Sequence, residues 1–162
     1  MRPGDFVITE ASGPLGQLVG AVTLSRYCHV RLVLDEDGTC ISADRDGAVL
    51  DAPRPGEIIV SPPLTDEQRG QIAETALPLL GTPYGLWDAA VLGLAHLGFR
   101  SASLERQIER PDRLFCSQLV DLVWSRVGFH AFNDGRLPQN VTPGDLADLA
   151  LRSGWTVVNP IP

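Results

Sequence analysis

The first 63 residues of the chain consist mainly of short strand-like runs, and this feature most restricts the folds open to it. Each run is apolar or alternating and is bounded by glycine, proline or acidic residues, as strands joined by short turns are. The sequence DEDG separates two of the runs and predicts a β-hairpin with an acidic turn. The expected strands cover residues 5–9, 29–35, 39–43, 47–52 and 56–63.

Most of the remaining chain has helical spacing instead. Thr65 and Gln68 form a capping-box pattern ahead of an apolar stripe that runs to residue 80. Gly128 stands where the helix that follows Cys116 should end, and Thr142 begins a last helix. Further helical stretches are expected at 12–25, 86–98 and 103–110, and 155–160 can return as a final strand. Residues 1–162 therefore read as a single α+β domain whose sheet comes mainly from the first sixty residues.

Composition limits the classes of partner. The chain has 162 residues, 44% of them hydrophobic, and a formal charge of −7. Nucleic acid and anionic membranes both require clustered basic residues, so neither is expected as the main partner. No run approaches the ~18 apolar residues of a membrane span, and no membrane insertion is expected. The N-terminus lacks an apolar signal-peptide region, which favours a cytoplasmic location unless another route releases the protein. The sequence gives no indication of oligomeric state.

The cysteines and basic residues limit the chemistry. Cys28, Cys40 and Cys116 are an odd number without CxxC spacing, so neither a disulfide framework nor a metal site is predicted, and no cofactor is expected. All 13 basic residues are arginine, which excludes Schiff-base chemistry on lysine. The remaining readings are buried structural thiols, or one reactive thiol that folding brings to a histidine.

Cys116 is the candidate nucleophile, because it stands just before an apolar helical run in LFCSQLVDLVW (114–124). Unpaired backbone N–H groups and the helix dipole at such a position favour a thiolate and are expected to lower the thiol pKa. The backbone N–H of Cys116 is a natural donor to an oxyanion. On position alone, a buried core cysteine is the commoner outcome.

His29 is the candidate base, because it begins a strand and can point from the sheet toward a packed element. Arg31 shares its face, since side chains alternate along a strand. If the hairpin closes between residues 35 and 38, Asp44 lies opposite His29, whereas a slip of two residues brings Ser42 closer. Either side chain could hold the imidazole in one tautomer.

The other histidines and cysteines, and Asp5, are expected to have mainly structural roles. His96 lies on an apolar helix and looks ordinary, while His130 in a loop is a reserve base. Cys28 adjoins His29, but neighbours on a strand diverge, so Cys28 and Cys40 are expected to be buried spacers. Asp5 is read as a turn residue at the start of a strand.

The order of these motifs resembles the papain-like NlpC superfamily of cell-wall peptidases in its circularly permuted form, the YiiX type, with lecithin retinol acyltransferase as a distant relative. In the unpermuted family, LGxPYxxGG and a DCSGLV-like nucleophile motif precede GDLVFF-, HVGIYIG- and FIHA-like strands. Here the second half of that pattern comes first. The matching pieces are GDFVIT (4–9), HVRLVLD (29–35), CISA (40–43), LGTPYG (80–85) and FCSQLV (115–120).

The resemblance implies a papain-like domain in which an antiparallel sheet or half-barrel packs against a helical half that carries the nucleophile. It makes Cys116 the nucleophile and His29 the general base and acid. Ser42 falls at the position of the third polar residue, and Tyr84 falls on the motif tyrosine, whose hydroxyl can assist the oxyanion. Serine orients an imidazole poorly, so Asp44 can replace Ser42, or Cys116 and His29 can act as a dyad.

Arg31 departs from the pattern, because it stands where the family has a small residue. It could narrow the groove or supply a charge that binds a substrate carboxylate. The alternative is a solvated position at a strand edge.

The expected function is that of a cysteine peptidase or amidase, which cleaves an amide bond in a small or cell-wall-type peptide through an acyl-enzyme. The expected partner is therefore a small peptide or acyl-amide substrate. A lipid acyltransferase or thioesterase is the alternative enzyme, and a catalytically weak binding module on the same fold is the alternative of another class.

Overall fold

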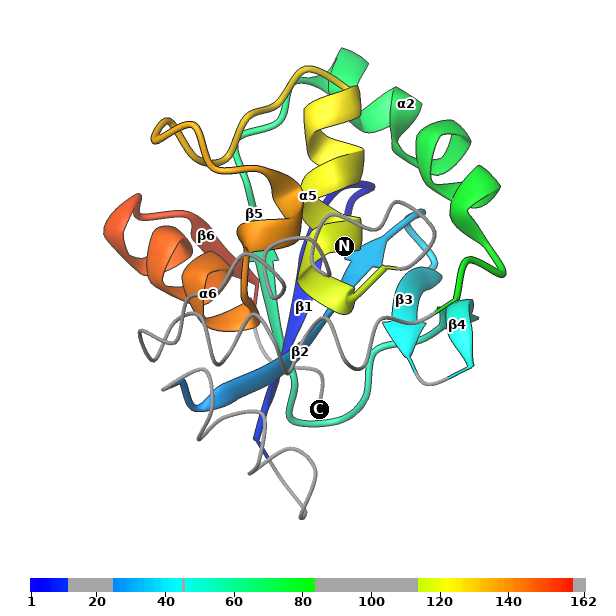
Figure 1. Ribbon diagram of the computed structural model, residues 1–162, viewed down its shortest axis with the longest axis horizontal. Coiled ribbons are helices and arrows are strands. Elements are labelled where there is room, and N and C mark those ends of the chain that lie inside the picture. Colours follow the sequence, from blue (N-terminus) through cyan, green and yellow to red (C-terminus); the bar gives the residue numbers. More distant parts are fainter. Residues whose placement is uncertain (12–24, 45, 84–113, 159–162) are drawn as a thin grey trace, which may run out of the picture.

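The computed structural model describes residues 1–11, 25–44, 46–83 and 114–158, and Figure 1 shows their arrangement. The helical segments expected at 86–98 and 103–110, and nearly all of the segment at 12–25, lie outside the described residues. Everything below concerns the described part of the chain.

Six strands form one antiparallel sheet in the order β4-β3-β2-β1-β5-β6. The strands expected in the first 63 residues are confirmed, and the sixth comes from the run near the C-terminus. Their bounds are β1 Phe6–Glu10, β2 Tyr27–Val33, β3 Cys40–Asp44, β4 Gly47–Asp51, β5 Ile58–Ser61 and β6 Thr156–Val158.

Capping residues marked the starts of α2 and α6 and the end of α5, whereas the stripe expected to run to residue 80 is divided between α2 and the short helix η1. Thr65 and Gln68 form the capping box of α2, and Thr142 forms one with Asp145 at the start of α6. Gly128 follows α5 with φ 79°, a conformation that glycine adopts without strain. The bounds are α2 Asp66–Ala76, η1 Leu77–Leu79, α5 Cys116–Arg126, η2 Pro138–Asn140 and α6 Pro143–Arg152.

Strand alternation gives the sheet two different faces. One face packs against α2, α5 and α6 and forms the main core, to which the strands contribute Phe6, Ile8, Val30, Leu32, Ile41, Ala43 and Val60. The opposite side, called the reverse face here, carries a smaller apolar cluster of Val7, Val33, Cys40 and Ile59. Residues two apart on one strand share a face, so the face of each candidate site residue follows from its parity.

Trp124 fixes α5 on the sheet. Its side chain is fully buried, packs edge-on against Phe6 at 5.3 Å and Phe129 at 5.6 Å, and donates from Nε1 to the Gly4 carbonyl at 3.1 Å. In Figure 1, α5 lies across the sheet and its first turn is near β2 and β3. The packing of the helix therefore determines where its first residue, Cys116, meets the sheet.

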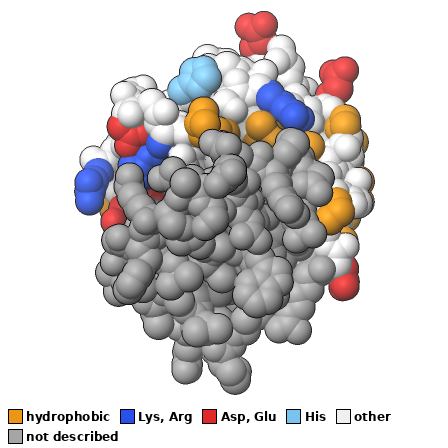
Figure 2. Space-filling model, viewed as in Figure 1, with side chains coloured by type: hydrophobic (Ala, Val, Ile, Leu, Met, Phe, Trp, Pro, Cys, Tyr) orange, Lys and Arg blue, Asp and Glu red, His pale blue; other side chains and the backbone are white. Residues whose placement is uncertain are grey.

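The described surface carries mixed charge. Figure 2 shows acidic and basic side chains interspersed on the described part of one face. Among the described residues, no helix is both long enough and apolar enough to cross a membrane.

Candidate active site

Cys116 is the first residue of α5, and the chain enters the helix in an extended conformation. Phe115 has φ −114° and ψ 165°, and its backbone N–H points to Oε1 of Gln118 at 3.4 Å. One residue earlier, the backbone N–H of Leu114 donates to the carbonyl of Pro83 at 2.9 Å. The described part of the LGTPYG motif therefore lies beside the segment that carries the candidate nucleophile.

The sulfur of Cys116 meets the backbone of β2. The backbone N–H of Val30, the residue after His29, is placed to hydrogen-bond the thiolate form. Val33 exchanges backbone hydrogen bonds with Gly4 and Asp5 on the β1 side. Hydrogen-bonding directions alternate along a strand, so the N–H of Val30 points toward β3. The side chain of Cys116 is only 4% exposed.

The pairing between β2 and β3 is short. It comprises Leu32 with Ile41 and Val33 with Cys40, whereas β2 stays paired with β1 as far as Tyr27. We call the region beyond the last pair, between residues 28–31 and 42–44, the β2–β3 junction. The Val30 N–H that meets Cys116 points into this junction, because no ladder partner on β3 takes it.

His29 bridges the same junction. Its Nε2 lies 2.7 Å from Oγ of Ser42 on β3. The strand register agrees with a hairpin closed between residues 35 and 38, which would place Asp44 opposite His29. The ladder ends before it reaches that pair, and the hydrogen bond goes to Ser42. Of the two candidate third groups, Ser42 bonds the ring directly, and Asp44 acts on it at least by charge.

The surroundings of His29 disfavour its protonated form. Burial lowers the pKa of His29, the charge of Arg31 lowers it further, and together they bring it to about 4. The carboxylates of Asp44, Glu57 and Asp51 oppose this shift. Asp44 itself is exposed. His29 is therefore neutral at pH 7 and able to accept a proton.

The thiol of Cys116 differs from the expectation of a lowered pKa. Burial raises its pKa to about 11, although the backbone N–H groups of Val30 and Ser117 favour the thiolate. The amide groups at the helix start act as expected, but desolvation of the sulfur outweighs them. At neutral pH the free protein holds a neutral thiol and a neutral imidazole.

Arg31 is not a solvated edge residue. Its side chain is 2% exposed, and it bonds Asp51 from Nε and Glu57 from Nη1, both at 2.7 Å. Nη1 also donates to Oγ1 of Thr9 at 3.1 Å. A buried guanidinium needs such partners, and protein carboxylates already supply them. The guanidinium of Arg31 is thus engaged by Asp51 and Glu57 within the protein, and a role in substrate binding stays a prediction.

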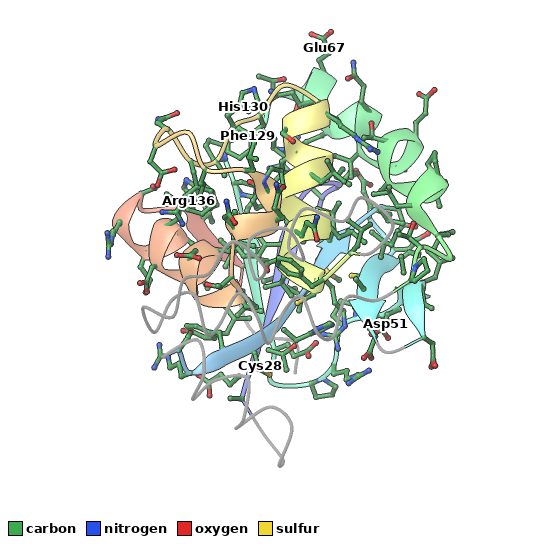
Figure 3. All side chains as sticks on the ribbon, viewed as in Figure 1. Cys28, Asp51, Glu67, Phe129, His130 and Arg136 are labelled. Carbon is green, nitrogen blue, oxygen red and sulfur yellow. The ribbon has the colours of Figure 1, made fainter. Side chains whose placement is uncertain are left out.

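The other candidates take different positions, and among the described residues Cys28 is the one that lies near Cys116, since its charge is among the causes that raise the Cys116 pKa. Tyr84 and His96 lie outside the described residues. Figure 3 shows His130 near the end of α5 and far from Cys28 on β2. Because α5 has 11 residues and rises about 1.5 Å per residue, its ends are roughly 15 Å apart, and His130 follows the end opposite Cys116. The sulfur of Cys28 is near the carbonyls of Thr9 and Glu10.

The sequence argument missed three residues of this region: Thr9, Asp51 and Glu57. Thr9 pairs with His29 across β1 and β2, and its hydroxyl donates to Oε1 of Glu57 at 2.7 Å. A signal for the two carboxylates was available. An arginine on a strand that is otherwise apolar requires acidic partners, and Asp51 and Glu57 stand at the ends of neighbouring strand-like runs.

The comparisons with known proteins concern the fold. No family model matches the sequence, and no curated protein matches it either. Among solved structures, the chain is similar to the crystal structure of metalloprotein YiiX from Escherichia coli O157:H7, with a TM-score of 0.61 and 16% identity. The likeness covers 99% of this chain and 97% of that one. The fold is YiiX-like. In the described part of this YiiX-like chain, no group of three or more His, Cys, Asp or Glu side chains is arranged to hold a metal ion.

The lowered pKa of His29 predicts a pH-dependent stability. An unfolded histidine titrates near 6.5, so between pH 6.5 and about 4 the unfolded state binds more protons than the folded state. The stabilisation from neutral His29 is complete above pH 6.5 and is lost as the pH falls toward 4. At ~1.4 kcal/mol per pKa unit, the loss is at most about 3.5 kcal/mol.

Urea denaturation at pH 7 and pH 4.5 measures this loss. In His29→Gln, the free energy of unfolding should depend less on pH than in the wild type. His130→Gln is the control, because its exposed side chain lies at the far end of α5. Equal pH dependence in the wild type and His29→Gln contradicts the prediction.

Proposed function

We propose that the protein is a cysteine hydrolase that cleaves an amide bond in a small or cell-wall-type peptide, with Cys116 as nucleophile and His29 as general base. One observation carries the proposal: the Cys116 sulfur lies at the backbone N–H of Val30, the residue next to His29, and the Nε2 of His29 is 2.7 Å from Oγ of Ser42. Cys116 reaches β2 from the helix start, and His29 spans the junction from β2 to β3.

The chemistry needs no preformed ion pair. His29 takes the thiol proton on Nδ1 while the sulfur attacks the carbonyl carbon, and the carbonyl electrons move to oxygen. The Cys116 backbone N–H stabilises this oxyanion. Collapse breaks the C–N bond, and the imidazolium returns the proton to the leaving amine. His29 then deprotonates a water molecule, which attacks the thioester and releases the acid and the thiol.

Ser42 serves this cycle as the partner of Nε2. A neutral ring that accepts on Nδ1 carries its hydrogen on Nε2, and the Ser42 oxygen at 2.7 Å can accept it. The Ser42 hydroxyl can donate to Nε2 or accept from it, and the proposed cycle uses the tautomer whose free lone pair is on Nδ1. Tyr84, a second contributor to the oxyanion by resemblance, lies outside the described residues.

The finer family assignment rests on motif order. The chain has the strand with His29 before the helix with Cys116, which is the reverse of the unpermuted NlpC pattern. Together with the YiiX-like fold, this order supports a circularly permuted NlpC-type domain. The same resemblance, and the acidic charge, favour a peptide over an anionic lipid as substrate.

An acyl-enzyme experiment tests the proposal. The protein is mixed with fluorogenic amides of short peptides that contain both L and D residues, and with matched acyl esters and thioesters. After an acid quench, mass spectrometry should find the acyl group on the peptide that contains Cys116. Acylation only by long-chain esters or thioesters would favour the lipid enzyme. No adduct and no turnover with any substrate would falsify the hydrolase proposal.

A second candidate function is a binding module on the same fold. The 4% exposure of Cys116 and its raised thiol pKa of about 11 favour it. In that case the same peptides bind in calorimetry without being cleaved, and Cys116→Ala leaves their affinity unchanged.

A further inference from the structure

Arg31 is among the largest fully buried side chains of the described residues, and it stands two residues from His29 on the same strand. Both residues have the parity of the reverse face, where Val33 and Cys40 also lie. A charged side chain this deep needs compensation that a hydrophobic residue of similar volume would not need. A buried arginine therefore lies two residues from the proposed base, at a position where a hydrophobic side chain would need no compensation.

The partners of Arg31 come from three other segments. Asp51 ends β4, Glu57 precedes β5, and Thr9 belongs to β1. A further hydrogen bond holds the Glu57 carboxylate in place: its Oε2 accepts from the backbone N–H of Arg54 at 2.8 Å. Figure 3 shows Asp51 beside β3 and β4. The network therefore connects β2 to β4 across the reverse face, over the short β2–β3 pairing.

This network also adjoins the imidazole itself. Thr9, which donates to Glu57 and accepts from Arg31, is the cross-strand partner of His29. Asp51 is paired with Cys40, and Ser42 lies two residues further along that strand. His29 thus has Thr9 as its cross-strand neighbour on β1, Arg31 two residues along its own strand, and Ser42 of β3 bonded to its ring.

We propose that Arg31 is a positioning residue for His29: its ion pairs with Asp51 and Glu57 hold the strands around the ring and keep a positive charge beside it, so that His29 stays neutral and bonded to Ser42. The assignment of His29 as a base rests on the proposed function. The coupling between Arg31 and His29 does not.

The charges that face His29 come from every neighbouring element. Arg31 on β2 opposes protonation, whereas Asp44 on β3, Asp51 on β4 and Glu57 before β5 favour it. Cys116 on α5 is neutral at pH 7 because burial raises its pKa. If Arg31 is removed, three carboxylates face the ring without the cation that balances them.

The test is an NMR titration of the His29 ring, assigned by comparison with His29→Gln. In Arg31→Met, the His29 midpoint should rise by about one unit or more, because Asp51 and Glu57 then face the ring without the Arg31 cation. In Glu57→Gln, which keeps the cation and removes an opposing charge, the midpoint should fall. Arg54→Met is the matched control: Arg54 also pairs with Asp51, at 3.5 Å, but its side chain is 64% exposed. It should leave the midpoint unchanged.

The pH dependence of turnover is an independent test of the coupling between Arg31 and His29. The acidic limb of the kcat/KM profile should move to higher pH in Arg31→Met, with a loss of about fivefold at pH 4, about twofold at pH 5 and almost none at pH 8. A folded Arg31→Met with an unchanged His29 midpoint overturns the proposal. If Arg31→Met does not fold, a midpoint in Glu57→Gln that fails to fall overturns it.

The titration needs no substrate, so the two proposals fail separately. A wild-type protein without turnover defeats the hydrolase assignment, while the coupling of Arg31 to His29 is still decided by the NMR midpoints.

Discussion

Cys116→Ala is expected to abolish amide cleavage while the fold stays intact. Loss of a nucleophile removes the covalent route altogether, so kcat should fall by on the order of 10⁴-fold or more. Alanine and cysteine are both small. Cys116 packs in the main core, and its side chain neither caps α5 nor forms an ion pair. Circular dichroism and the melting temperature should therefore stay close to those of the wild type.

Cys28→Ala and Cys40→Ala are the controls for this result. Cys40 is fully buried on the reverse face, and Cys28 bonds backbone carbonyls of β1, so neither thiol enters the proposed cycle. Both variants should keep wild-type kcat. Activity that survives in Cys116→Ala, or disappears in Cys28→Ala, would assign the chemistry to a different residue.

Two further variants separate the candidate third groups. Ser42→Ala removes the hydroxyl that is 2.7 Å from Nε2 and should lower kcat by roughly tenfold, because the ring loses its orienting partner. Asp44→Asn should have a smaller effect, since Asp44 influences the ring by charge. The reverse order of effects would make Asp44 the orienting group.

Local patterns predicted the elements of this fold well, because their causes are local. Alternation and turn residues predicted the strands, and the capping boxes at Thr65 and Thr142 marked where α2 and α6 begin. The hairpin between β2 and β3 has the register that its turn implied. Each of these features depends on residues within a few positions of one another.

The junction that forms the candidate site could not be predicted in this way. The β2–β3 ladder ends after Leu32 and Ile41, and the start of α5 approaches at that point. The end of the ladder depends on the packing of a helix more than eighty residues away in sequence. The choice of Ser42 over Asp44 follows from it, because an unbroken ladder would have favoured Asp44.

The thiol pKa of Cys116 and the burial of Arg31 could not be predicted from the sequence for the same reason. A helix start lowers a thiol pKa through neighbouring amides, which the sequence shows, but the burial that raises it at Cys116 comes from distant segments. The position of Arg31 on a strand was visible in the sequence. Its burial between Asp51 and Glu57 depends on how three strands come together.

Asp5 shows a further long-range effect, and it leads to the largest expected loss of stability. The expected turn is present, since the backbone N–H of Asp5 donates to the Arg2 carbonyl. The carboxylate also forms a buried ion pair with Arg69 of α2 at 2.8 Å, with side chains 1% and 6% exposed. Arg69 donates further to the carbonyls of Pro3 and Pro62. This cluster joins the first strand to α2.

Asp5→Asn is therefore expected to cost about 3–5 kcal/mol of unfolding free energy, because it leaves the Arg69 cation buried without its counter-charge. For a chain of this size, the melting temperature should fall by roughly 6–20 °C. Calorimetry or urea denaturation measures the loss, and the double variant Asp5→Leu/Arg69→Met should recover much of it, since an apolar pair leaves no buried charge.

Asp66→Asn is the matched control for that experiment. Asp66 forms an ion pair with Arg2, but the two side chains are 90% and 56% exposed, so the change should stay within about 1 kcal/mol. Equal losses in Asp5→Asn and Asp66→Asn would show that burial does not set the strength of the Asp5–Arg69 pair. A large loss confined to Asp5→Asn, rescued in the double variant, would show that a buried charge without a partner is what the fold cannot tolerate at this position.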